Sequence, residues 1–123
     1  MSGLDWTATL LGAALAYGLG MVWFGPMMFG RTWARGSHGL TPPDSPPLAA
    51  MGLMALGTVL LALAIGMTAA MEALGLALLI PAAAATIQFA MALFSLKTPA
   101  AALVDGGYVL AMGVVMIATH AVI

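Results

Sequence analysis

The chain contains no cysteine and very few charged residues. Of its 123 residues, three are Lys or Arg and four are Asp or Glu, which is 6% of the sequence, and the formal net charge is −1. The absence of cysteine excludes disulfides, thiolate metal sites and Cys nucleophiles. Because there is no excess of basic residues to attract a polyanion, we expect no nucleic-acid partner.

The sequence is instead dominated by apolar residues. Hydrophobic residues make up 63% of the chain, and its mean hydropathy is +1.12. A sequence of this kind has too little polar surface to cover a water-soluble globule. We therefore expect an all-α, polytopic membrane protein whose main partner is the lipid bilayer.

Four apolar runs, at about 6–25, 48–70, 73–96 and 99–123, are each long enough for a helix to cross a hydrocarbon core of about 30 Å. Asp5 and the pairs Ser45-Pro46 and Thr98-Pro99 are typical helix starts. Glu72 interrupts the apolar sequence and predicts a tight turn. The whole chain, residues 1–123, is thus expected to be one integral membrane domain, a four-transmembrane-helix bundle.

The connection at 26–47 is the longest non-membrane segment. Phe29 and Trp33 are four residues apart, and Arg31 and Arg35 form a second pair on the other side, which predicts a short interfacial helix after the first span. An irregular loop whose arginines reach lipid phosphate is the alternative. The proline-rich stretch at 41–47 favours an extended linker. The residues expected to anchor the chain at the membrane surface are Trp23, Phe29, Arg31, Trp33, Arg35 and Lys97.

Small residues recur at every fourth position of the first two spans. Such strips let another helix backbone approach closely, so they predict helix packing. We expect one strip to pack within the chain and the other to meet a second chain. The residues concerned are Gly12, Ala16 and Gly20 in the first span and Ala62 and Gly66 in the second.

Polar side chains within the spans are the candidates for a functional cluster. Counting along the helices places Tyr17, Gln88, Asp105 and Tyr108 in the same half of the membrane, where they are expected to face the bundle interior. Asp105 lies six residues after Pro99, about 9 Å along a helix. It is therefore either an anchor paired with a nearby cation such as Lys97, or a functional intramembrane carboxylate.

Neither histidine suggests chemistry. His38 falls in the first connection and His120 at the far end of the last span, so the two cannot share a metal ion within one chain. Ser37 precedes His38 directly and lacks the setting of a nucleophile. We expect no catalytic, cofactor-binding or metal-binding residues and no enzymatic activity.

The three cations indicate an orientation. Two fall in the first connection and one, Lys97, in the third, whereas the other side of the membrane has none. Since loops rich in Lys and Arg stay in the cytoplasm, the 26–47 loop is predicted to be cytoplasmic and both termini outside.

Three short motifs carry a family resemblance. Trp23-Phe24-Gly25-Pro26, then Phe29-Gly30-Arg31-x-Trp33, then Gly107-Tyr108 resemble the four-helix bacterial membrane family named domain of unknown function 1761. The resemblance implies a bacterial inner-membrane protein with this topology and lends no activity. Members often have His after the Tyr, where this chain has Val109, so no role of that imidazole carries over.

Two functions remain as expectations. The favoured one is a helix-packing accessory, scaffolding or self-associating subunit, in a homo-oligomer or a larger membrane complex. The alternative is a minimal small-molecule or ion transporter or channel subunit acting as a dimer. The glutamate that small multidrug exporters carry in their first helix has no counterpart between Ala8 and Trp23, which lowers a cation-exporter interpretation.

Overall fold

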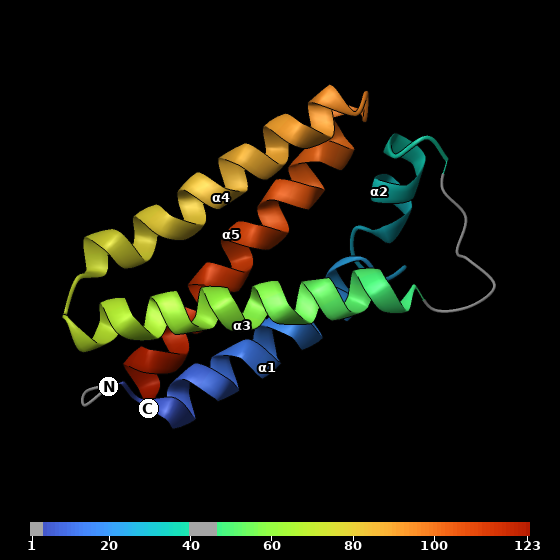
Figure 1. Ribbon diagram of the computed structural model, residues 1–123. Helices are drawn as coiled ribbons and strands as arrows, with labels where there is room; N and C mark the ends of the chain where they lie inside the picture. Colours follow the sequence, from blue (N-terminus) through green and yellow to red (C-terminus); the bar gives the residue numbers. More distant parts are fainter. Residues whose placement is uncertain (1–3, 40–46) are drawn as a thin grey trace.

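A computed structural model describes residues 4–39 and 47–123. Within these residues the chain is all-helical and has no strands, which confirms the expected fold class (Figure 1). Four helices are long and apolar enough to span a membrane, as in a multi-pass membrane protein, and a short helix follows the first of them. The helices are α1 (Trp6–Trp23), α2 (Gly30–Gly36), α3 (Leu48–Ala70), α4 (Leu74–Phe94) and α5 (Pro99–Val122).

Helix α5 is the central element of the bundle. It contacts each of the other four helices, and half of the residues in its most apolar 18-residue stretch are buried, against 28% in α1 and 17% in α3 and in α4. Helix α1 begins and α5 ends at the same end of the bundle (Figure 1). We call this the histidine end, after His120, and the opposite end, with α2 and Lys97, the lysine end.

Capping side chains and a proline explain where two of the helices begin. The Asp5 carboxylate accepts a hydrogen bond from the Ala8 amide at 3.0 Å, and the Thr98 hydroxyl accepts one from the Ala101 amide at 3.2 Å, so both expected caps are present. Pro99 occupies the first turn of α5, where its missing N–H is not needed. The linker expected at 41–47, including the Ser45 cap, lies almost wholly outside the described residues.

The first span ends earlier than expected, at Trp23 rather than at residue 25. The chain bends sharply there, because the amides of Phe29 and Gly30 donate to the carbonyls of Trp23 and Gly25 at 3.1 and 3.0 Å. A Cβ on Gly30 would lie 2.6 Å from the Phe24 carbonyl oxygen, so only glycine fits this bend. The Gly-Pro and Phe-Gly-Arg motifs therefore fold α2 back toward α5.

Two short turns connect the last three helices, and each uses a non-glycine residue with positive φ. Glu72 (φ 53°) ends the turn after α3, where the Ala73 amide donates to the Thr68 carbonyl at 2.8 Å. Leu96 (φ 62°) has the same role after α4, where the Lys97 amide donates to the Ala92 carbonyl at 3.2 Å. Both are Schellman-type helix ends, which favour glycine at this position.

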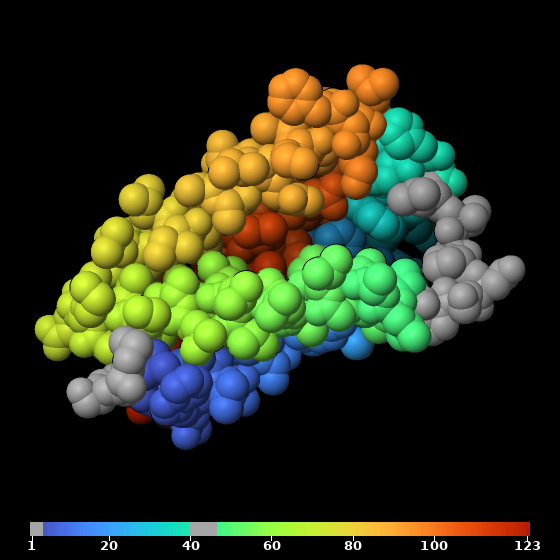
Figure 2. All heavy atoms as spheres, viewed as in Figure 1, coloured from blue at the N-terminus to red at the C-terminus, as the bar shows by residue number. Residues whose placement is uncertain are grey.

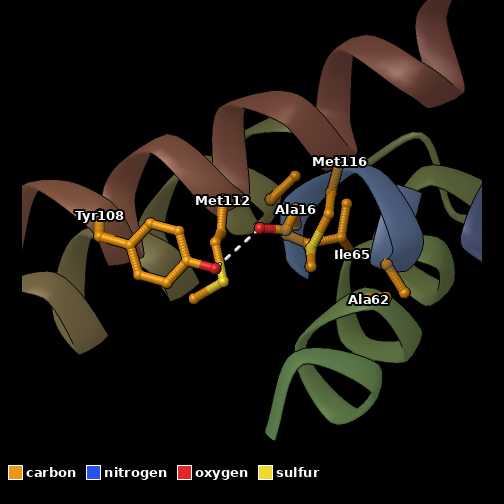
Figure 3. Close-up of a cluster of buried hydrophobic side chains, with 8 residues drawn as sticks. Ala16, Ala62, Ile65, Tyr108, Met112 and Met116 are labelled. Carbon is orange, nitrogen blue, oxygen red and sulfur yellow. Dashed lines mark hydrogen bonds between the residues drawn. The ribbon is translucent and has the colours of Figure 1, made fainter. Parts of the chain in front are cut away.

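The core is built from alanine, methionine and a few larger side chains. Met112 and Met116 of α5 lie between α1 and α3, beside Ala16 and Ile65 (Figure 3). Because so many core residues are small, the backbones approach closely and the larger side chains fill the remaining space. The core therefore centres on the junction of α1, α3 and α5, with α4 attached to the side of α5.

Helices α3 and α4 diverge from the turn at Glu72, so a hollow separates them toward the lysine end (Figures 1 and 2). At the narrow end, a cavity of about 330 Å³ lies between them and α5, with Thr68, Ala77 and Ile117 among its lining residues. We call the hollow that continues from this cavity the α3–α4 groove.

Candidate functional site

The candidate site is an ion pair at the lysine end, two turns into α5. The side chain of Asp105 is buried, with the residue 7% exposed. One carboxylate oxygen, Oδ2, lies 2.8 Å from Lys97 Nζ, and the other, Oδ1, accepts a hydrogen bond of 2.8 Å from the Trp33 indole N–H. Both oxygens are thus engaged by groups from two other parts of the chain.

The turn after α4 and helix α2 place the two partners of Asp105. Lys97 follows Leu96 in the turn, and its ammonium lies 5.4 Å from the centroid of the Trp33 ring, a cation–π distance. The Lys97 side chain is 20% exposed, so the pair lies at the edge of the bundle rather than deep within it. Each charge therefore neutralises the other where water is scarce.

An aromatic cluster packs beside the ion pair. Phe24 stacks edge-on against both Trp33 and Tyr108, at centroid distances of 5.2 and 5.3 Å, and Trp23 lies 4.7 Å from Phe29. These geometries are the favourable tilted and T-shaped ones. The cluster covers the junction of α1, α2 and α5 and shields the Asp105 pair.

The polar atoms of this cluster bond to backbone carbonyls. The Trp23 indole donates to the Val104 carbonyl at 3.0 Å. The Tyr108 hydroxyl donates to the Ala16 carbonyl at 2.7 Å, as the dashed line in Figure 3 shows. Each bond joins α1 to α5, and each takes up an N–H or O–H that would be costly to leave unpaired in an apolar setting.

The four polar residues expected to form one cluster have separate hydrogen-bond partners or none. Tyr17 donates to the Met51 carbonyl at 3.2 Å, Tyr108 to Ala16, and Asp105 pairs with Lys97 and Trp33, so no hydrogen bond joins these residues to one another within the described chain. Gln88 is exposed on α4. The expectation that Gln88 is enclosed in the bundle interior is wrong, because α3 diverges from α4 and does not cover it.

The two small-residue strips both pack inside the chain. A Cβ on Gly12 would meet Met116, one on Gly20 would lie 2.6 Å from the Tyr108 hydroxyl oxygen, and one on Gly66 would lie 2.5 Å from the Thr9 hydroxyl oxygen. Ala16 and Ala62 are fully buried. The expectation that one strip meets a second chain is therefore wrong, because α1 uses its strip against α5 and α3 uses its strip against α1.

The expected surface anchors divide into two groups. Arg31, Arg35 and Phe29 are exposed, as anchors require. Trp23, Trp33 and Lys97 instead direct their polar groups into the chain, where each has a partner. The Trp33 role was missed because it needs α2 to fold back onto α5, which no local sequence pattern indicates.

The histidines lie at opposite ends of the bundle. His38 Nε2 lies 2.8 Å from the Ser95 carbonyl oxygen at the lysine end. His120 is partly buried, and its Nε2 has no hydrogen-bond partner among the described residues. No group of three His, Asp or Glu side chains in residues 4–39 and 47–123 is close enough to hold a metal ion.

A second cavity borders the aromatic cluster. It has a volume of about 270 Å³ and lies between α1, α3 and α5. Tyr17 and Tyr108 contribute to its wall, together with apolar residues such as Met51 and Met54. Its lining suits an apolar group and offers no charged side chain.

Comparison with known proteins identifies the family. No curated protein and no solved structure matches the chain. Residues 7–121 match the family described as "Protein of unknown function (DUF1761)". The match covers nearly the whole chain, including the motifs that form the bend and the start of the aromatic cluster. The chain therefore belongs to the DUF1761 family, as the resemblance predicted.

Proposed function

We propose that this protein is a small integral membrane subunit that acts through helix packing, associating with itself or with a larger complex in the bacterial inner membrane. The observation that carries the proposal is the full engagement of Asp105 by Lys97 and Trp33. A structural subunit uses its intramembrane polar groups to hold its own helices together, and this carboxylate does so.

Several other polar groups of the bundle support the same function. Tyr108 and Trp23 bond to carbonyls of facing helices, and Thr58 and Thr119 bond to carbonyls one turn back in their own helices, each at 2.7 Å. A transport path needs polar groups that exchange partners with a passing solute. These groups already have fixed partners within the chain.

A minimal transporter or channel subunit acting as a dimer is the second candidate. The observation that favours it is the cavity of about 270 Å³, because both Tyr17 and Tyr108 line it. In that case a small molecule binds beside the tyrosines. Its binding then affects the Asp105 ion pair through the aromatic side chains that lie between them.

The proposed orientation places the lysine end in the cytoplasm and both termini outside. Arg31, Arg35 and Lys97, the only Lys and Arg residues of the chain, belong to the lysine end. Positive-inside bias then favours a cytoplasmic location for that end. Reporter fusions at the C-terminus test this: activity only of a periplasmic reporter is expected, and activity only of a cytoplasmic reporter would reverse the orientation.

Two measurements test the function: the association of the purified protein with itself or a partner, and the passage of solute through vesicles that contain it. We expect the purified protein in mild detergent to form a defined oligomer or to retain a membrane partner, and Asp105→Asn to leave this association intact. Reconstituted vesicles are expected to pass no more solute with the wild type than with Asp105→Asn. If the protein is a monomer without a partner, and if it passes a solute whose flux Asp105→Asn abolishes, the packing function is wrong and the transporter function is favoured.

A further inference from the structure

Gln88 lies on the inner side of α4 and yet is exposed. At 100° per residue, its position falls within about 60° of those of Ala77, Pro81 and Ala92. These three residues are buried, whereas Gln88 is exposed. The side of α4 that carries Gln88 is therefore covered by this chain toward the histidine end and near Ala92, but not at Gln88 itself.

The divergence of α3 and α4 explains this exposure. Thr68 of α3 and Ala77 of α4 line the same cavity at the narrow end of the α3–α4 groove. Farther along α3, Leu61 and Gly57 fall within about 40° of Thr68 and so belong to the wall that faces the groove. A Cβ on Gly57 would meet nothing within 4 Å, so this position of α3 is uncovered by the rest of the chain.

The exposed amide lies within the membrane-spanning part of α4. Gln88 is six residues before Phe94, the last residue of the helix, which corresponds to about 9 Å along the axis. Its side chain makes no hydrogen bond to another described residue, whereas the nearby Thr86 hydroxyl donates to the Ala82 carbonyl at 2.8 Å. Lipid tails cannot pair with an amide, so leaving Gln88 against them is strongly unfavourable.

We propose that a second copy of this chain occupies the groove, so that α4 of each copy lies in the α3–α4 groove of the other and the two Gln88 amides hydrogen-bond across a two-fold axis. An amide has both donors and an acceptor, so it is complementary to an identical amide. A two-fold contact places the same residue of both copies at the axis. This inference rests on the proposed function: it identifies a second copy of the chain as the partner and the α3–α4 groove as the interface.

Gly57 supports this choice of occupant. Small residues at helix interfaces in membranes allow close backbone approach, and Gly57 provides such a place on the α3 wall of the groove. The strips on α1 and α3 that pack inside the chain leave Gly57 unused, because it lies on another side of α3 from Ala62 and Gly66. The groove thus combines an unpaired amide with room for a helix.

Cysteine crosslinking in vesicles tests the contact, and the chain has no native cysteine to interfere. Ala84→Cys and Met91→Cys lie about one turn on either side of Gln88, and both positions are exposed. We expect each to give a disulfide-linked dimer on mild oxidation. Val114→Cys, on an exposed position of α5, is the control and is expected to remain monomeric. Equal crosslinking at Val114 would indicate random collision and overturn the proposal.

Dilution of fluorophore-labelled protein in vesicles then measures the strength of association by energy transfer. Gln88→Leu keeps the size of the side chain and removes the amide, so we expect about a tenfold weaker dimer. Gly57→Leu, which fills the groove, is expected to weaken it as well. Thr86→Val is the matched control, since this hydroxyl is paired within its own helix, and should change association less than twofold.

The outcomes separate the two proposals. Wild-type association in Gln88→Leu, or a monomer at every dilution, would overturn the Gln88 contact. If the protein still assembles through another face or with another membrane protein, the proposed function stands without this interface. A flux that depends on Asp105 would overturn the proposed function itself, whichever result the Gln88 variants give.

Discussion

The backbone amide of Thr98 donates a hydrogen bond of 3.0 Å to the carbonyl oxygen of Gly36. This bond joins the last residue of α2 to the cap residue of α5, although 62 positions separate them in the sequence. It satisfies an amide that precedes α5 and a carbonyl at the end of α2, two groups that helix termini leave unpaired. The same contact holds Trp33 in reach of Asp105.

Gly36→Ala is expected to release α2 from α5. The added Cβ would collide with the Thr98 hydroxyl oxygen and the Ala101 Cβ. We expect a loss of about 1–3 kcal/mol in the free energy of unfolding, measured by denaturant titration in micelles with tryptophan fluorescence as the probe. Gly52→Ala is the control: nothing lies within 4 Å of its added Cβ, so this helical substitution should stabilise the protein slightly. Equal effects of the two substitutions would contradict the docking of α2.

Loss of the Lys97 ammonium is expected to cost more than loss of the Asp105 charge. Lys97→Met leaves a buried carboxylate without its cation, and we expect a loss of about 3 kcal/mol. Asp105→Asn leaves an ammonium that is partly exposed and retains an oxygen for Trp33, so about 1 kcal/mol is expected. The double variant should lose less than the two singles together. The free energy of unfolding of all four proteins forms the cycle, and strict additivity would show that the two side chains do not interact.

Tyr108→Phe and Gly20→Ala are expected to be coupled. The first substitution removes the hydrogen bond to Ala16 and is expected to lower the free energy of unfolding by about 1 kcal/mol. The second places a Cβ 2.6 Å from the tyrosine oxygen. Because Tyr108→Phe removes that oxygen, Gly20→Ala should cost less in the Phe background than in the wild type. Thermal unfolding of the four proteins measures this, and an unchanged cost would mean that the clash is relieved elsewhere.

Leu96→Gly is expected to stabilise the protein. Leu96 holds a left-handed conformation that a residue with a Cβ adopts at a cost, and its side chain is 81% exposed, so little packing is lost. We expect a gain of about 1 kcal/mol in the free energy of unfolding. Leu93→Gly, inside α4, should instead destabilise the protein by about as much. A loss of stability in Leu96→Gly would show that the leucine contributes contacts that outweigh the strain.

Local sequence patterns predicted the elements well. The apolar runs, the caps at Asp5 and Thr98 and the turn at Glu72 depend on neighbouring residues, which is why the helices were readable without a structure. The pairing of Asp105 with Lys97 was also accessible, since only eight residues separate them. The Trp33 contact was not, because it depends on a bend that brings α2 back onto a helix much later in the chain.

The errors concern partners rather than elements. The repeat of Gly12, Ala16 and Gly20 correctly indicates a closely packed helix face but carries no information on which helix meets it. Helical spacing placed Gln88 on the side of α4 that faces the bundle, yet its exposure depends on the angle between α3 and α4. That angle arises from the packing of α5 between them, which no single segment encodes.

The central position of α5 also affects the order of assembly. It follows the other four described helices in the sequence, so it leaves the ribosome after them, and it supplies the partners of Gly12, Ala16 and Trp23 in α1 and of Pro81 in α4. Until it enters the membrane, the earlier helices have inserted without the surfaces that hold them together. A chain that stops before Pro99 would therefore present unmatched helix faces and polar groups to the membrane, as a substrate for quality-control proteases. Completion of the bundle is in this way coupled to the synthesis of α5.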